Sequence, residues 1–130
     1  MSFKNINLDE QTMKAIIMII PYMLDFVEIE FYNNQINDGI AAGLVFAVFA
    51  NPSIRRITVA YNYMRLGLTK SLAKLIKMKP HKLDEINIMG SIIYTDHIDP
   101  IIRTLLTNKA IRHLNIAGCS LTHASCRDLA

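Results

Sequence analysis

The side chains that could coordinate a metal or act as nucleophiles are few in this sequence and lie far apart. Cys119 and Cys126 lack the close spacing of a zinc site. His123 lies near Cys119, but a Cys–His nucleophilic pair needs a third orienting group and a pocket. No phosphate-binding glycine loop is present, and no two histidines have the spacing of a metal pair on one helix. The histidines are His81, His97, His113 and His123. We therefore expect a protein that is not an enzyme and that needs no cofactor.

Side chains suited to recognition are denser, because polar and apolar residues alternate in four short stretches, as they do on a half-buried strand. One column of polar positions alternates in charge: Glu28, Arg56, Glu85 and His113. Adjacent parallel strands lie about 4.8 Å apart, so this column could be an exposed ion-pair ladder that adds little stability. The alternative is a polar recognition strip with Tyr32 and Met89 as anchors, because aromatic residues and methionine are enriched at interfaces.

The four stretches are copies of one repeat. The first copy reads Phe26-x-x-Ile29-x-Phe31-x-x-Asn34-x-Ile36, a strand followed by a tight turn. The copies start at 26, 54, 83 and 111, so the periods are 28, 29 and 28 residues. A fixed period of this size is typical of a solenoid.

The turn position of the repeat holds Asn34, Asn62, Ser91 and Cys119. An amide side chain has both donors and an acceptor, so these residues should stack and bond the backbone of neighbouring turns. A partial copy comes first, with Phe3 one period before Phe31. In that register Ile6 falls at the turn, where it cannot form such bonds, so the ladder should begin at Asn34. A rival register, Phe3-x-x-Ile6-x-Leu8, matches the strand spacing but breaks the period.

A helical stretch follows each turn, and the expected helices are 9–22, 38–50, 68–78 and 96–107. Each carries two core residues at i and i+4, which lie on one helix face. The core pairs are Ile16 and Ile20, Leu44 and Val48, Leu72 and Ile76, and Ile101 and Leu105. Asp38 and Asp96 stand where N-caps are expected. The prolines of Asn51-Pro52 and Lys79-Pro80 predict two helix ends. Gly39 and Gly67 should ease the turn into a helix.

These residues resemble leucine-rich repeat proteins of the ribonuclease-inhibitor-like class, in which a strand, an Asn or Cys turn and a full helix make a unit of about 28 to 29 residues. The resemblance covers the whole chain. It implies an α/β fold: a horseshoe segment of solenoid with parallel strands on the concave side and helices on the convex side. It also implies one domain, 1–130, that binds proteins. The expected repeats are 26–53, 54–82 and 83–110, with a partial repeat 1–25 and a truncated repeat 111–130.

Two surfaces are candidates for binding. The concave face would hold the partner-binding residues Glu28, Glu30, Tyr32, Arg56, Thr58, Glu85, Asn87, Met89, His113 and Asn115. The second surface is convex. The segment 39–50 contains no charged residue, although a solenoid helix should show a polar face. An exposed apolar patch there would mark self-association, through Phe46, Phe49, Met18 and Tyr22; otherwise these side chains pack between helices.

The composition restricts partner and location. Hydrophobic residues make up 52% of 130 residues, enough for a continuous core, and the net charge of +3 permits acidic partners without demanding them. Lysines gather on the third helix, but no aromatic residues are interleaved with them for base stacking, so nucleic acid is disfavoured. They are Lys70, Lys74, Lys77 and Lys79, with Arg65 and Lys82 nearby.

The apolar runs 15–24 and 39–50 are shorter than the roughly 20 residues that span a bilayer. The polar start lacks the order of a signal peptide, and the two cysteines suit a reducing compartment. We therefore expect a cytoplasmic protein, and a secreted effector acting in a host cytosol stays open.

Three functions remain open at this level. The first is a protein-interaction module or scaffold that uses the concave face. The second is an adaptor or regulatory part of a larger assembly, such as substrate recognition in a ubiquitin ligase, GTPase regulation or a pathogen effector. The third is a self-associating structural subunit. The last repeat stops after Leu129, so we expect either a fragment of a longer array or an end that another chain covers.

Overall fold

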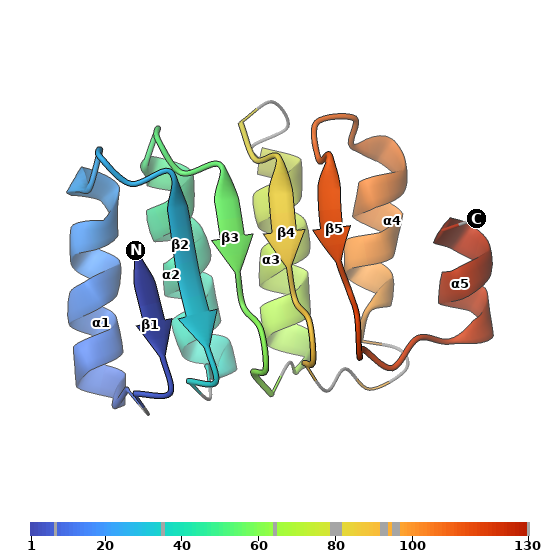
Figure 1. The fold of residues 1–130 in the computed structure, drawn as a ribbon, viewed down its shortest axis with the longest axis horizontal. Helices are drawn as coiled ribbons and strands as arrows, with labels where there is room; N and C mark the ends of the chain where they lie inside the picture. The colour runs from blue at the N-terminus through green and yellow to red at the C-terminus, as the bar shows by residue number, and fades with distance from the viewer. Residues whose placement is uncertain are drawn as a thin grey trace.

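The structure is a computed structural model, and it describes residues 1–6, 8–34, 36–63, 65–78, 82–91, 94 and 97–129. Strands and helices alternate through these residues (Figure 1). The strands are β1 (Ser2–Lys4), β2 (Glu28–Tyr32), β3 (Arg56–Thr58), β4 (Glu85–Asn87) and β5 (His113–Asn115). The helices are α1 (Glu10–Ile19), α2 (Asp38–Ala50), α3 (Leu66–Met78), α4 (Asp99–Thr107) and α5 (His123–Leu129), and a short 3₁₀ helix, η1 (Ile20–Tyr22), follows α1.

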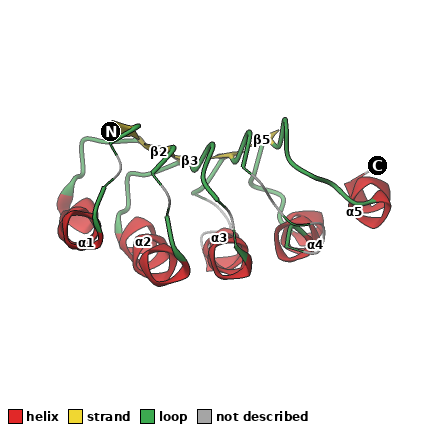
Figure 2. Ribbon diagram, turned by 90° about the horizontal axis from the view of Figure 1, so that it is seen from below, coloured by secondary structure: helices red, strands yellow, loops and turns green. Residues whose placement is uncertain are grey.

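The strands form one parallel sheet in the order β1-β2-β3-β4-β5. Figure 2 shows the helices side by side on one face of this sheet. The other face, which we call the open face, carries no helix among the described residues. This arrangement confirms the coarse expectation of an α/β fold in which a parallel sheet alternates with helices.

The strand register confirms the repeat period. Phe3 lies opposite Phe31, Ile29 opposite Ile57, and Ile57 opposite Ile86. The partners in the sheet are thus 28 or 29 residues apart. The pairing of Phe3 with Phe31 also decides between the two registers of the partial copy, in favour of the one that keeps the period. The two phenylalanine rings stack with their centroids 5.2 Å apart.

The core lies between the sheet and the helix layer. Strand residues such as Ile29, Ile57 and Ile86 are buried, and they meet buried helix residues such as Leu44 and Leu72. Seven of the eight predicted helix core residues are buried. The eighth, Leu105, is half-buried and packs against the same core. Burying apolar area of this kind is the main favourable term in folding.

The predicted turn ladder is present. The Asn34 amide donates to the carbonyls of Phe3 (2.8 Å) and Tyr32 (3.2 Å), so the ladder does begin at Asn34. Asn62 donates to Phe31 and Ala60 in the same way, both at 2.9 Å. The two weaker members each donate once. The Ser91 hydroxyl bonds the carbonyl of Val59 at 3.0 Å, and the Cys119 thiol bonds that of Ile88 at 3.2 Å.

The helix starts differ from the prediction at α2, α3 and α4. The α3 helix begins at Leu66 instead of residue 68, and α4 begins at Asp99 instead of residue 96. Asn37, not Asp38, caps α2, because its side chain accepts from the backbone N–H of Ile40 at 2.9 Å. Asp38 instead accepts from the backbone N–H of Leu68, at the start of α3, at 3.2 Å. Both residue types are good caps, so composition alone could not choose between neighbours.

Gly67 has a different role from the one expected. A Cβ at Gly67 would lie 2.2 Å from the Asp38 carboxyl carbon. Glycine is therefore needed at this position so that Asp38 can reach α3, and not to ease a turn. The expected helix end at Ala50 is confirmed, with Asn51 as the C-cap. The expected cap Asp96 and the pair Lys79-Pro80 lie outside the described residues.

Candidate binding surfaces

The predicted strip of polar residues follows β2 to β5 across the open face. Glu28, Glu30 and Tyr32 alternate with buried Ile29 and Phe31 along β2. The equivalent residues of the later strands share the same register. They are Arg56 and Thr58, then Glu85, Asn87 and Met89, and finally His113 and Asn115. Thr58 is the exception to the expected exposure, since it is only 6% exposed. It lies between Glu30 and Asn87 in the sheet, and these longer side chains leave it little surface.

Among the described residues, the ion pairs that involve this strip join β1 to β2 and β2 to β3. Arg56 contacts Glu28 at 3.3 Å, and Lys4 contacts Glu30 at 3.3 Å. Glu85 makes no ion pair with any described residue. The predicted charge ladder therefore stops after one step. The paired side chains are partly exposed, so each pair contributes little to stability. The Ser2 hydroxyl, followed by Lys4, lowers the pKa of the Glu30 carboxyl.

Two asparagines of the strip already have structural partners. Asn87 accepts a hydrogen bond from the Met89 backbone N–H, and Asn115 accepts one from that of Ala117, both at 3.1 Å. Each bond closes a turn directly after a strand. Their side-chain oxygens are thus occupied, which leaves the charged residues, Tyr32 and Met89 as the better candidates for contact with a partner.

A cluster of tyrosines at the ends of the strands was missed by the sequence reasoning. Four of the five tyrosines gather there: Tyr32, Tyr61, Tyr63 and Tyr94. The Tyr32 and Tyr61 rings touch, with centroids 4.8 Å apart. The Tyr63 and Tyr94 hydroxyls lie 3.4 Å apart. Of these residues only Tyr32 falls within the strand pattern. An available signal was Tyr61 itself, since the other described repeats hold Asn or Gly at its position.

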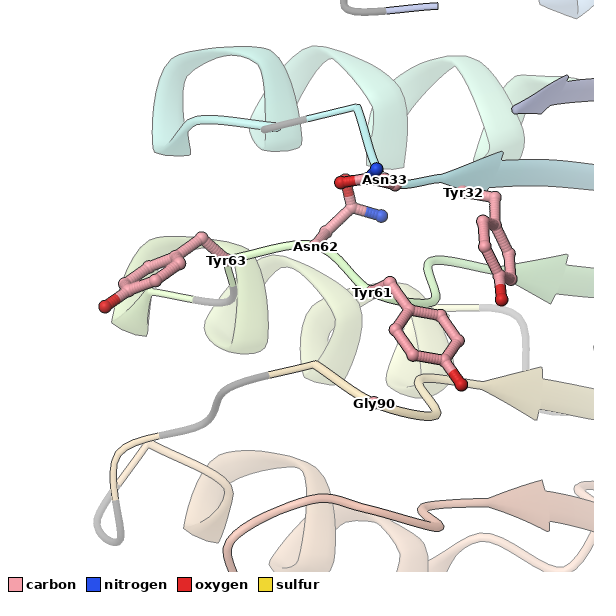
Figure 3. A pocket seen from close by; sticks show the side chains of 6 residues that line it. All are labelled: Tyr32, Asn33, Tyr61, Asn62, Tyr63 and Gly90. Carbon is pink, nitrogen blue, oxygen red and sulfur yellow. The ribbon is translucent and has the colours of Figure 1, made fainter. Parts of the chain in front are cut away.

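Two adjoining hollows lie among these rings, and we call them together the tyrosine groove. The smaller has a volume of about 260 Å³ and is lined by Tyr32, Asn33, Tyr61, Asn62, Tyr63 and Gly90 (Figure 3). The larger has a volume of about 970 Å³ and shares Asn33, Tyr61 and Tyr63 with the first. Tyr94, His97, Asp38 and Arg65 are among the residues that complete its wall.

The environment of the groove favours the neutral form of the Tyr32 and Tyr63 hydroxyls. Desolvation, followed by the Tyr61 hydroxyl, raises the pKa of Tyr32. The hydrogen bond with Tyr94 raises the pKa of Tyr63. Both shifts move the phenols further from ionisation, so each hydroxyl keeps its proton and can donate a hydrogen bond to a ligand.

The outer surface of α1, η1 and α2 exposes four large, mainly apolar side chains. Met18 is 72% exposed, Tyr22 83%, Phe46 68% and Phe49 38%. The helices α1 and α2 are neighbours in the helix layer (Figures 1 and 2). These side chains are therefore at the surface and are not packed between helices. On α3 the lysines Lys70, Lys74 and Lys77 are exposed as well, while Lys79 lies outside the described residues.

Among the described residues, no three His, Cys, Asp and Glu side chains could share a metal ion. Burial raises the pKa of the Cys119 thiol, and its hydrogen bond to Ile88 belongs to the turn ladder. His81 lies outside the described residues. Within the described ranges, no helix is both long and apolar enough to cross a membrane.

The alternation of strand and helix, with one polar turn residue per unit, defines a leucine-rich-repeat-like fold. Comparison with solved structures supports this class. The tropomodulin C-terminal domain of Caenorhabditis elegans is similar, with a TM-score of 0.81 over 99% of this chain and 78% of that one. The two sequences are 14% identical, so the likeness shows the fold alone. No protein-family description and no curated protein matches this sequence.

This neighbour corrects the expected subclass. The repeat had suggested the ribonuclease-inhibitor-like class, and that assignment is wrong, since the similar structure is a tropomodulin domain with a leucine-rich-repeat-like fold. The apolar positions and the turn residue of the repeat predict one strand, one turn and one helix. Such a unit does not distinguish one class of leucine-rich-repeat-like fold from another.

Proposed function

We propose that this chain is a protein-interaction domain that binds a protein partner through the open face of its sheet. The observation that carries the proposal is the one-sided helix layer. The described helices pack on a single face, so the polar side chains of β2 to β5 stand on the other face without a covering element. A parallel sheet is usually covered on both faces. An uncovered face with charged and aromatic side chains is suited to a partner.

On this proposal the chain is a horseshoe segment of leucine-rich repeat solenoid, with the strands concave and the helices convex. In Figure 2 the helices follow a shallow arc with the strands on its inner side, which supports this curvature. The repeats would be 26–53, 54–82 and 83–110, flanked by partial units 1–25 and 111–130 in one domain. The two free thiols, Cys119 and Cys126, favour a reducing, cytosol-like compartment.

Tyr32 and Met89 would anchor the partner, and Glu28, Glu30, Arg56, Glu85 and His113 would select its charge. These residues lie on neighbouring strands and together offer both signs of charge. A partner with a complementary pattern would gain specificity and association rate more than affinity from them. The same mixture of charge disfavours a nucleic acid, which is bound by concentrated positive charge.

Site-specific photo-cross-linking tests the proposal. A photoreactive amino acid placed at Asn87 should yield covalent adducts with a partner in a lysate of the source organism. The same group at Lys74, on the helix side, should yield none of them. Glu30→Arg and Tyr32→Ala should each abolish the adduct while the circular dichroism spectrum stays unchanged. Adducts that form equally from Lys74, or that survive both substitutions, would contradict the open face as the site.

A second candidate function is self-association through the outer surface of α1 and α2. The specific observation is α2, which has no charged residue after Asp38 and exposes Phe46 and Phe49. Contiguous exposed apolar surface of this kind marks an interaction site.

A further inference from the structure

We propose that the tyrosine groove binds a proline-rich peptide segment in the polyproline II conformation. This inference rests on the proposed function in one respect, because it too assumes that the ligand is a protein. It names an adjoining part of the surface, at the carboxyl ends of the strands, which shares Tyr32 with the open-face site. It also names a specific chemistry for the segment that binds there.

The first support is the placement of the rings. Tyr61, Tyr63 and Tyr94 are about half exposed although they are large and partly apolar. Figure 3 shows Tyr61 and Tyr32 turned to one side of the Asn62 turn and Tyr63 turned to the other. Tyr63 meets Tyr94, whose ring packs edge-on against His97 with the centroids 5.4 Å apart. Aromatic surface thus runs through both hollows instead of closing into the core.

The second support is backbone strain at Tyr61. Its φ of +53° lies in the left-handed region, which is unfavourable for a residue with a side chain. Asn5, Asn33, Gly90 and Gly118 take this conformation in the other repeats, and Asn and Gly tolerate it better. The ring of Tyr61 contacts Tyr32 and lies over Gly90, yet the residue keeps 46% of its surface exposed, so much of it is free to contact a ligand. Strain of this kind is concentrated at ligand sites.

The third support is the match of polarity. Arg65 and Asp38 both line the groove, so its fixed charges cancel. The tyrosine hydroxyls, Arg65 and the Asn37 amide supply hydrogen-bond donors. A polyproline II segment has no internal hydrogen bonds and presents free carbonyl acceptors, and its proline rings are compact and apolar. Aromatic-lined grooves with such donors are the known way to bind proline-rich segments.

Two other ligands fit less well. A methylated-lysine cage needs aromatic rings around an open space and a negative surrounding, whereas the Tyr32 and Tyr61 rings touch and Arg65 is a cation in the wall. Single-stranded nucleic acid stacks on aromatic rings but also needs a positive groove along its backbone. Asp38 balances the charge of Arg65 here, so the groove lacks the net positive charge that a nucleic acid needs. The experiment below includes an oligonucleotide to test this.

Fluorescence anisotropy with a fluorescein-labelled decaproline peptide is the experiment. We expect the full chain to bind decaproline saturably and not to bind a ten-residue Gly-Ser peptide. Tyr63→Ala should raise the Kd by about tenfold or more, since buried aromatic contacts dominate such interfaces. Tyr61→Asn should do the same while keeping a residue suited to the left-handed backbone, so that loss of binding is not loss of fold. The matched control is Tyr22→Ala, the fifth tyrosine, which lies outside the groove and should leave the Kd unchanged.

The proposal is overturned if decaproline shows no saturable binding at millimolar protein, or if neither groove variant changes its Kd. It is overturned as well if a ten-nucleotide oligothymidine binds at least as tightly and competes with the peptide. Glu30→Arg separates this inference from the function proposed above. Peptide binding that persists in Glu30→Arg while partner capture is lost would support two sites, and loss of peptide binding in that variant would contradict a separate groove.

Discussion

At the scale of single residues, one backbone position has the same left-handed conformation in each repeat. Asn5, Asn33, Tyr61, Gly90 and Gly118 are spaced by the repeat period, and their φ angles lie between +53° and +69°. The chain turns here as it leaves each strand. Asn33 donates a hydrogen bond to the side chain of Asn5 at 2.9 Å, while the ring of Tyr61 lies over Gly90. The two glycines thus share a conformation but not an environment.

That difference predicts unequal costs for the same substitution. Gly118→Ala meets only ordinary contacts, the nearest at 3.5 Å, so it should lose about 1–2 kcal/mol of unfolding free energy from the backbone conformation. Gly90→Ala places a Cβ 2.5 Å from the Tyr61 ring and should lose more. Urea denaturation followed by circular dichroism measures both values. Adding Tyr61→Asn to Gly90→Ala should bring its cost down to that of Gly118→Ala. Equal costs for the two single variants would refute the role given to the ring.

Residue types predicted the turn ladder but not the tyrosine groove. Asn34 and Asn62 recur at a position where an amide has an evident structural role, so their hydrogen bonds could be expected. Tyr63 and Tyr94 come from loops, and their separation of 31 residues does not match the period. The repeat pattern therefore gave no reason to expect the two rings to meet.

At the scale of elements, an asparagine after a helix joins it to the helix before. Asn51 donates to the carbonyls of Ile20 (2.6 Å) and Met23 (3.0 Å), and it accepts from the backbone N–H groups of Ser53 and Ile54. It is fully buried. Asn108 after α4 plays the same role less completely. It donates to Ile76 at 3.2 Å and is only half-buried.

Asn51→Ala should therefore be among the most destabilising polar substitutions in the chain. It would leave several buried backbone groups without partners, and each such group costs about 1–3 kcal/mol. We expect Asn108→Ala to cost less, because water can reach its partners. Chemical denaturation of the two variants in parallel provides the comparison. A smaller loss for Asn51→Ala than for Asn108→Ala would show that burial does not set the cost.

The repeat pattern predicted where α2 lies more accurately than it predicted which residue caps it. The segment 38–50 was predicted without error as α2, because its core spacing and the proline after Asn51 agree. The cap was assigned one residue late, at Asp38 instead of Asn37. Adjacent Asn and Asp are equivalent as residue types, and only the three-dimensional path of the backbone decides which one reaches the N–H of Ile40.

At the scale of the whole molecule, each unit packs only against the units next to it. Among the described residues α1 contacts α2, α2 contacts α3, α3 contacts α4, and α4 contacts α5, and the strands pair in the same order. The sheet order could be predicted for this reason, since a constant period brings each strand beside the previous one. The class of repeat protein could not, because neighbour packing of this kind is common to many such folds.

The apolar outer surface of α1 and α2 predicts self-association. We expect the mass from light scattering during size exclusion to rise above that of a monomer as the concentration rises. Phe46→Glu and Phe49→Glu should each restore the monomer, because a charge there must be desolvated in the interface. The matched control is Leu106→Glu, which changes a 60% exposed residue of α4 outside this surface and should have no effect. A monomer at every concentration would rule out this second function and leave the open face.

The turn ladder has a direction along the chain. In each of its four members the side chain donates to a carbonyl of the preceding repeat: Asn34 to Phe3, Asn62 to Phe31, Ser91 to Val59 and Cys119 to Ile88. During synthesis the acceptor has therefore always left the ribosome before its donor. Each new repeat finds the carbonyl acceptor for its turn side chain already in place, and it supplies the acceptor for the turn N–H of the repeat before it, as Asn62 does for Asn34 and Ser91 for Asn62. The chain can therefore acquire its structure vectorially, with the turn of each unit completed by the next.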